Sequence, residues 1–183
     1  MSDPHQLPLT LADSPSGTGS ELEATTGEEE MHGTETGAEG DHRPVRSFQA
    51  SAGIQGRQFA EQCDTLLGHM GFDLDGRRVL AEVGVEIDQQ ATSPNGRVVW
   101  FEYKGSVQGN RPGLRRTDTL KKAIANGALL RAVEAPAPYV VITSHLPEAG
   151  SGAAMLRAAL DLGYLTDVIC LYDPSATARL RRW

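Results

Sequence analysis

Two β-rich segments joined by a tight turn place the strongest constraint on how this chain folds. The sequence GRRVLAEVGVEIDQQA, residues 76–91, is followed by the turn sequence SPNG, residues 93–96, and then by VVWFEYKG, residues 98–105. An Asn-Gly pair between two such segments is typical of a β-hairpin turn. The pattern predicts neighbouring antiparallel strands, with residues 79–91 forming either one bent strand or two strands broken near Gly84.

A charged pair interrupts the second strand of this predicted hairpin. Glu102 and Lys104 project from the same face, because side chains alternate along a strand, and their Cα atoms are about 6.6 Å apart. A simple alternative is a pair on the solvent face of an edge strand, where it prevents aggregation. Trp100 shares that face and argues against full exposure. On the preceding strand Asp88 and Glu86 share a face, so the hairpin is expected to bring Asp88 towards Glu102 and Lys104.

This convergence suits the hydrolysis of a phosphodiester bond. Two carboxylates and a backbone carbonyl can hold Mg²⁺, or Mn²⁺, while leaving positions for water and for phosphate oxygens. The ammonium group of Lys104 would orient or help to deprotonate the attacking water and would offset charge on the phosphorus centre. We therefore expect a divalent metal at Asp88 and Glu102, with Lys104 beside it.

The rest of the chain alternates helices and strands. Apolar spacing predicts helices over 55–70, 117–132 and 152–162, and strands over 138–144 and 166–172. Thr117 or Asp118 is the expected N-cap of the second helix. A hairpin followed by alternating helices and strands predicts the α/β class, with a mixed central sheet covered by helices on both faces in three α/β/α layers.

The first helix, VEID, the hairpin and FEYKGS together resemble the PD-(D/E)xK nuclease superfamily, which has the restriction-endonuclease-like fold. Its motif is an Asp, a spacer of about ten or more residues, and then Asp/Glu-x-Lys; here thirteen residues separate Asp88 from Glu102-Tyr103-Lys104. The resemblance covers approximately residues 53–145. It implies an αβββαβ core and a metal-dependent endonuclease, with Asp88 and Glu102 as metal ligands, Lys104 as the catalytic lysine and the Tyr103 carbonyl as a further ligand.

Two other glutamates are weaker candidates for the same site. Some members of the superfamily carry a glutamate on the first helix that assists the metal, and Glu61 lies on the corresponding helix here. On a helical wheel Glu61 falls about 180° from the apolar stripe, so we expect it to face solvent. Glu86 is included because it shares a strand face with Asp88.

A basic segment follows the charged strand and predicts contact with nucleic acid, with DNA as the expected partner. A loop rich in glycine and proline runs into the N-terminus of a helix, and backbone amides at such a terminus grip phosphates together with basic side chains. The candidate residues are Arg111, Arg115, Arg116, Lys121 and Lys122.

The N-terminal segment has a different composition. Residues 1–46 are rich in Gly, Ser, Thr, Pro and Glu, and are predicted to be a disordered acidic tail ahead of a nuclease-like domain over 47–183. The first 44 residues hold ten acidic residues and one arginine, so the net charge of −7 becomes +2 over residues 45–183. The tail is either an inert solubilising extension or a regulatory mimic of a phosphate chain.

The remaining sequence features bear on where in the cell the protein is found. Cys63 and Cys170 each lie among apolar neighbours, as buried free thiols do, and neither a secretory signal nor a membrane-spanning run is present. We therefore expect a cytoplasmic protein that does not enter a membrane.

Two alternatives to an enzyme stay open. One is a catalytically inactive nucleic-acid-binding module or subunit of the same fold, and the other is an interaction protein whose acidic tail is the working part. The resemblance also implies a homodimer or a larger nuclease assembly, because small nucleases of this kind commonly need a second copy or a partner to cut both strands.

Overall fold

The computed structural model describes residues 45–105 and 112–183, with side chains from residue 53 onward. The chain divides into two units, 1–41 and 42–183. The predicted acidic tail and Arg111 therefore lie outside the described residues, except for Val45 and Arg46, which belong to the first helix.

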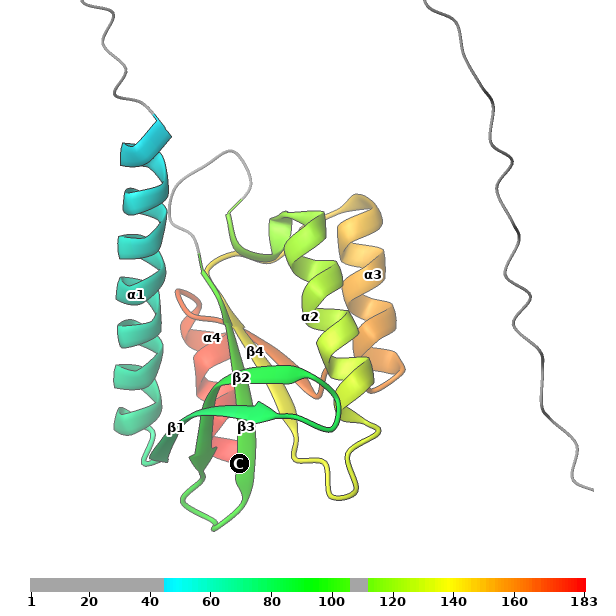
Figure 1. Cartoon of the computed structure of the whole chain (residues 1–183). Helices are drawn as coiled ribbons and strands as arrows, with labels where there is room; N and C mark the ends of the chain where they lie inside the picture. The colour runs from blue at the N-terminus through cyan, green and yellow to red at the C-terminus, as the bar shows by residue number, and fades with distance from the viewer. Residues whose placement is uncertain (1–44, 106–111) are drawn as a thin grey trace, which may run out of the picture. The chain divides into compact units, whose positions relative to one another are not determined.

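The described residues form a five-stranded sheet and four α-helices (Figure 1). None of these helices is long and apolar enough to cross a membrane. In chain order the elements are α1 (Val45–His69), β1 (Asp73–Leu80), β2 (Val85–Thr92), β3 (Val98–Lys104), the 3-10 helix η1 (Gly113–Arg115), α2 (Thr117–Leu130), β4 (Tyr139–Thr143), α3 (Gly150–Asp161), β5 (Asp167–Cys170), α4 (Pro174–Thr177) and the 3-10 helix η2 (Ala178–Arg182).

The sheet is mixed, as the sequence predicts. Its strand order is β1-β2-β3-β4-β5, with antiparallel pairing from β1 to β3 and parallel pairing from β3 to β5. Helices α2 and α3 supply the crossovers between the parallel strands, which cannot be joined by a short turn. Residues 79–91, for which the sequence allows one bent strand or two strands, belong to two strands. Gly84 lies in the turn between them with φ 64°.

The predicted hairpin turn between β2 and β3 is confirmed. Ser93 N–H donates to the Arg97 carbonyl at 2.9 Å, and Gly96 N–H donates to the Ser93 carbonyl at 2.8 Å. Gly96 has φ 78°, a conformation that a residue with a Cβ adopts at a cost. This turn sets the register of β2 against β3 and so determines which of their side chains face each other.

Each face of the sheet has its own hydrophobic core, which gives the three-layer arrangement visible in Figure 1. Residues of α1, α4 and η2 pack on one face, with Phe59, Leu67, Phe101, Ile142 and Leu180 among the buried side chains. Residues of α2 and α3 pack on the other, with Ile87, Trp100, Leu120, Val141 and Ala159 among them. Since β3 has a strand on each side and a helical layer on each face, a polar side chain in it is shielded from water.

Several element boundaries differ from those that the sequence predicts. Helix α1 begins at Val45 rather than at 55. Gly53, a residue of low helix propensity, lies in the part of the helix that the apolar spacing does not predict. The N-cap of α2 is Arg116, with no side-chain cap, and not Thr117 or Asp118. Strand β1 extends back to Asp73 and lies at the edge of the sheet. Its pairing with β2 shifts register, so buried and exposed side chains do not alternate regularly along it.

Candidate active site

Asp88 and Glu102 stand at facing positions where the pairing of β2 with β3 ends. The last paired residues are Gln89 and Phe101, so Asp88 precedes one and Glu102 follows the other. Beyond this point the Asp88 carboxylate replaces the backbone of β2 as the partner of β3, since its Oδ2 accepts a hydrogen bond from Tyr103 N–H at 2.7 Å. The structure thus brings together the two carboxylates that the sequence predicts to converge.

Glu102 is buried in the centre of the sheet, with only 2% of its surface exposed. This excludes the interpretation of the charged pair as the solvent face of an edge strand. The Glu102 carboxylate forms an ion pair with Lys104, and Asn126 Nδ2 of α2 donates to its Oε1 at 3.5 Å. Its other oxygen, Oε2, is buried and makes no hydrogen bond of good geometry within the described residues.

The electrostatics of Glu102 reflect this burial. Burial raises the pKa of Glu102 above its ordinary value, the ammonium of Lys104 opposes that rise, and the charge of Asp88 adds to it. Burying a carboxylate is costly unless its oxygens are paired. A buried carboxylate with a second carboxylate facing it is arranged to accept a cation.

Lys104 lies at the end of β3 and is only partly shielded, with its side chain 15% exposed. Its backbone is fixed, because the Lys104 carbonyl accepts a hydrogen bond from Thr143 Oγ1 of β4 at 2.8 Å. The next residue, Gly105, packs so closely on the ring of Phe59 that a Cβ there would come within 2.0 Å of it. The ammonium group therefore projects from a rigid strand end.

Tyr103 points to the opposite face of β3, towards α1. Its hydroxyl donates to Asp64 Oδ1 at 2.6 Å, and burial, followed by the Asp64 carboxylate, raises the pKa of the phenol. The N–H and C=O of one residue in an extended strand point to the same side. Because Tyr103 N–H points to Asp88, the Tyr103 carbonyl is directed towards that carboxylate as well.

Two residues beside Glu102 are missed by sequence reasoning. Asn126 of α2 donates to Glu102, and the hydroxyl of Tyr139 at the start of β4 interacts with the same carboxylate, which lowers the pKa of Glu102. Burial raises the pKa of Tyr139, and the negative charge of Glu102 raises it further, so the phenol stays neutral. Neither residue lies in a motif, and only the packing of α2 and β4 on β3 reveals them.

The weaker glutamate candidates lie away from this cluster. Glu61 is exposed on α1, as the helical wheel predicts. Glu86 forms an exposed ion pair with Arg77 of β1. The side-chain cluster at the end of β3 therefore contains Asp88, Glu102 and Lys104 without either of them.

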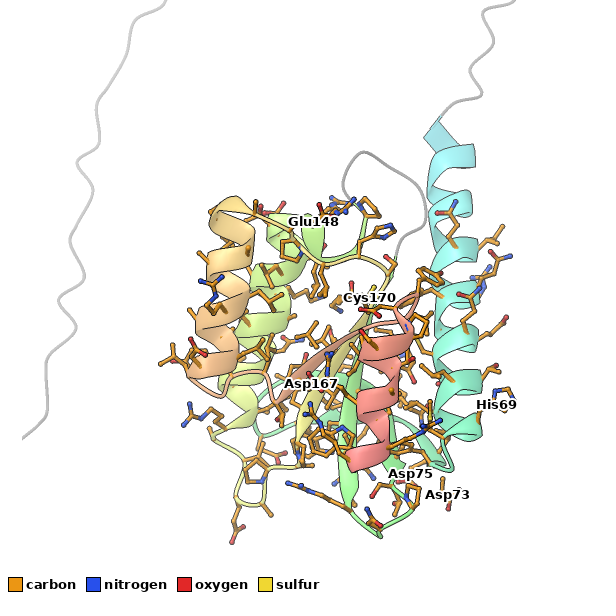
Figure 2. The ribbon with its side chains drawn as sticks, turned by 180° about the vertical axis from the view of Figure 1, so that it is seen from behind. His69, Asp73, Asp75, Glu148, Asp167 and Cys170 are labelled. Carbon is orange, nitrogen blue, oxygen red and sulfur yellow. The ribbon has the colours of Figure 1, made fainter. Side chains whose placement is uncertain are left out.

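The basic candidates divide into paired and unpaired residues. Arg115 in η1 forms an ion pair with Glu148, which Figure 2 shows at the end of the domain where α3 begins. Arg116, Lys121 and Lys122 are exposed around the N-terminal half of α2 and form no ion pair with the described residues. Among the described residues of this basic segment, these three have no ion-pair partner and can meet an external phosphate.

The side chains and carbonyl at the end of β3 form a small set of oxygen donors for a divalent cation. Within residues 45–105 and 112–183, no three His, Cys, Asp or Glu side chains are grouped so that they could hold a metal ion. The oxygen donors gathered here are two carboxylates, Asp88 and Glu102, and the carbonyl of Tyr103. Mg²⁺ is usually held by one or two carboxylates and retains several waters, so this smaller set fits it.

Comparisons of the chain with protein-family models, with curated proteins and with solved structures found no match.

Proposed function

We propose that this protein is a nuclease that hydrolyses phosphodiester bonds, most simply those of DNA, with Mg²⁺ or Mn²⁺ as cofactor. The observation that carries the proposal is the buried Glu102 carboxylate, which faces Asp88 across the two strands and is paired with Lys104. Two carboxylates at facing strand positions beside a lysine are an arrangement more typical of a functional site than of a core.

The order of elements supports the restriction-endonuclease-like core. The first six major elements are α1, β1, β2, β3, α2 and β4, with three antiparallel strands followed by one parallel strand. This is the αβββαβ arrangement that the resemblance implies. The acid of the motif lies on β2 and the Glu-x-Lys lies on β3, so the hairpin accounts for the long spacer between them.

In this proposal each residue has a defined task. Asp88, Glu102 and the Tyr103 carbonyl would hold the cation, which when bound supplies a Lewis acid and an acidified water. The ammonium of Lys104 orients the attacking water and offsets the negative charge that develops on the phosphate. Asn126 and Tyr139 keep the Glu102 carboxylate in one orientation, and Arg116, Lys121 and Lys122 position the phosphate backbone.

The test is cleavage of supercoiled, linear, branched and single-stranded DNA, and of RNA, with Mg²⁺ or Mn²⁺. We expect Glu102→Gln and Lys104→Met each to lower the cleavage rate at least about 100-fold, because each removes a charge at the reacting centre. Glu86→Gln, a change to an exposed acid on the same strand as Asp88, is the matched control and should cleave at the wild-type rate.

Folding of each variant is confirmed by its thermal unfolding midpoint, so that loss of activity is not loss of structure. Cleavage that persists unchanged in both Glu102→Gln and Lys104→Met would show that the activity arises elsewhere. A wild-type protein that cleaves none of these substrates with either metal would contradict the enzyme proposal itself.

A second candidate function is nucleic-acid binding without catalysis. It is favoured by the ion pair in which Lys104 already neutralises Glu102 and by the absence, among the described residues, of a third acidic ligand. This candidate requires DNA binding in EDTA that is unchanged in Glu102→Gln and weakened when Arg116, Lys121 and Lys122 are neutralised. Metal-dependent cleavage distinguishes the two functions.

A further inference from the structure

A hollow of about 250 Å³ lies at the start of β4, away from the candidate active site. Its walls include Arg97, Arg131, Tyr139, Tyr164 and Thr166. Tyr139 pairs with Trp100 in the sheet and Thr143 pairs with Lys104, so the hollow and Lys104 are separated by four residues of β4, or about 13 Å. The hollow is therefore distinct from the end of β3, although Tyr139 in its wall interacts with Glu102.

Both arginines of the hollow are held by aromatic rings. The guanidinium of Arg97 packs over Trp183 at 5.3 Å from the ring centroid, and that of Arg131 packs over Tyr164 at 5.5 Å. Arg131 also donates to the Leu162 carbonyl at 2.8 Å. A guanidinium stacked by its face keeps N–H donors at its edge for a further partner.

Neither arginine has an acidic partner within the described part of the chain. The ion pairs there involve Arg77, Lys104, Arg115, Arg179 and Arg182, and not Arg97 or Arg131. Both residues line the same hollow, so an anion bound there would meet positive charge that no acidic residue of the described chain neutralises. The hydroxyl of Thr166, which accepts from Tyr139 N–H at 3.0 Å, keeps its own proton for donation.

We propose that Arg97 and Arg131 form a phosphate-binding site in this hollow. The planar fork of N–H donors on arginine matches phosphate oxygens, and the volume is below that of a pocket for a drug-sized ligand but admits a phosphate group. The phosphate belongs either to a nucleic-acid backbone, a form that rests on the proposed function, or to a free phosphate compound.

The position of Arg131 favours the nucleic-acid source. Arg116 precedes the first residue of α2 and Arg131 follows its last residue, so about 22 Å of helix separates them. That length corresponds to about six nucleotides of duplex rise. Basic side chains at both ends of α2 can thus contact one strand at two places, one near the candidate active site and one at the hollow.

The experiment measures binding in EDTA, where no metal-dependent cleavage takes place, so that its result does not depend on catalysis. The double variant Arg97→Gln/Arg131→Gln is compared with Arg157→Gln, which removes one exposed arginine of α3 that does not line the hollow. Each protein is titrated with a fluorescent oligonucleotide duplex over a salt series, and separately with inorganic phosphate by calorimetry.

The slope of log K against log salt is negative, and we expect the double variant to reduce its magnitude by about two, roughly one for each lost phosphate contact, while Arg157→Gln leaves it unchanged. Lost phosphate binding with unchanged duplex binding also supports the site and assigns it to a free phosphate. The inference is overturned when the double variant matches wild type in both titrations, or when wild type binds neither probe.

A second variant guards against a folding defect, since Arg97 also packs on Trp183. Pro136→Glu places a carboxylate at an exposed position of the hollow wall and leaves both arginines and their rings in place. We expect the same loss of binding as in the double variant. Normal phosphate and duplex binding by a folded Pro136→Glu protein contradicts the site.

Discussion

At the scale of single residues, Glu102 shows how the candidate site differs from an ordinary core. Most side chains around it are apolar and buried. Burial among them is the chief reason why the pKa of Glu102 is raised. The surrounding fold therefore favours the protonated carboxyl, and a bound cation would favour the carboxylate. Proton and cation compete for one group, so binding of metal should weaken as the pH falls through the raised pKa.

The raised pKa of Glu102 should also appear in the free energy of unfolding of the metal-free protein, measured as a function of pH. A carboxyl whose pKa is higher in the folded than in the unfolded chain contributes stability that is complete below the unfolded pKa and is lost as the pH rises through the folded one. Glu102→Gln is neutral throughout, so its stability relative to wild type should increase with pH across that window. Urea unfolding midpoints from acid to mildly basic pH test this, and Glu61→Gln, an exposed change, should show no such trend.

At the scale of elements, the end of β3 is held by packing on α1. Gly105 lies where a methyl group would overlap the ring of Phe59, whereas Gly56, in α1, has open space around it. Gly105→Ala should therefore destabilise the domain by about 1–3 kcal/mol through overpacking. Gly56→Ala should stabilise it by up to about 1 kcal/mol, because alanine is the better helix former. Equal effects of the two substitutions on urea unfolding would contradict this account.

The elements also show what a sequence can and cannot predict. Strand alternation and the Asn-Gly turn are local signals, and they were sufficient to place Asp88 on β2 and to pair it with Glu102 and Lys104 on β3. The contacts of Asn126 and Tyr139 with Glu102 depend on how α2 and β4 pack against β3, which no local pattern records. The side-chain hydrogen bond of Asp88 to Tyr103 N–H also depends on where the two strands part.

At the scale of the whole domain, the C-terminal segment is fastened across β5 and the hairpin. Asp167, 7% exposed and labelled in Figure 2, pairs with Arg179 and Arg182. The Trp183 carbonyl accepts a hydrogen bond from Asn95 in the hairpin turn at 2.8 Å. Sequence patterns did not predict α4 or η2, because this segment is held by these distant partners rather than by its own periodicity.

Removing the buried acid should loosen this fastening. Asp167→Ala leaves two partly exposed arginines without their shared partner, and we expect a loss of about 2 kcal/mol in the free energy of unfolding, below the full value for a buried pair. Glu148→Gln, which removes the partner of Arg115 at an exposed site, should cost less than about 1 kcal/mol. Chemical denaturation of both variants measures the difference; a loss for Glu148→Gln as large as that for Asp167→Ala would argue against the fastening role.

Tyr139 is shared between the two ends of this domain. Its ring lines the hollow of Arg97 and Arg131, while its hydroxyl interacts with the Glu102 carboxylate. If phosphate binds in the hollow and a cation binds at Glu102, as we propose, each ligand would change the affinity of the other through this side chain by the same factor. One shared phenol would thus make the two binding events cooperative, or mutually exclusive, without any movement of the strands that carry it.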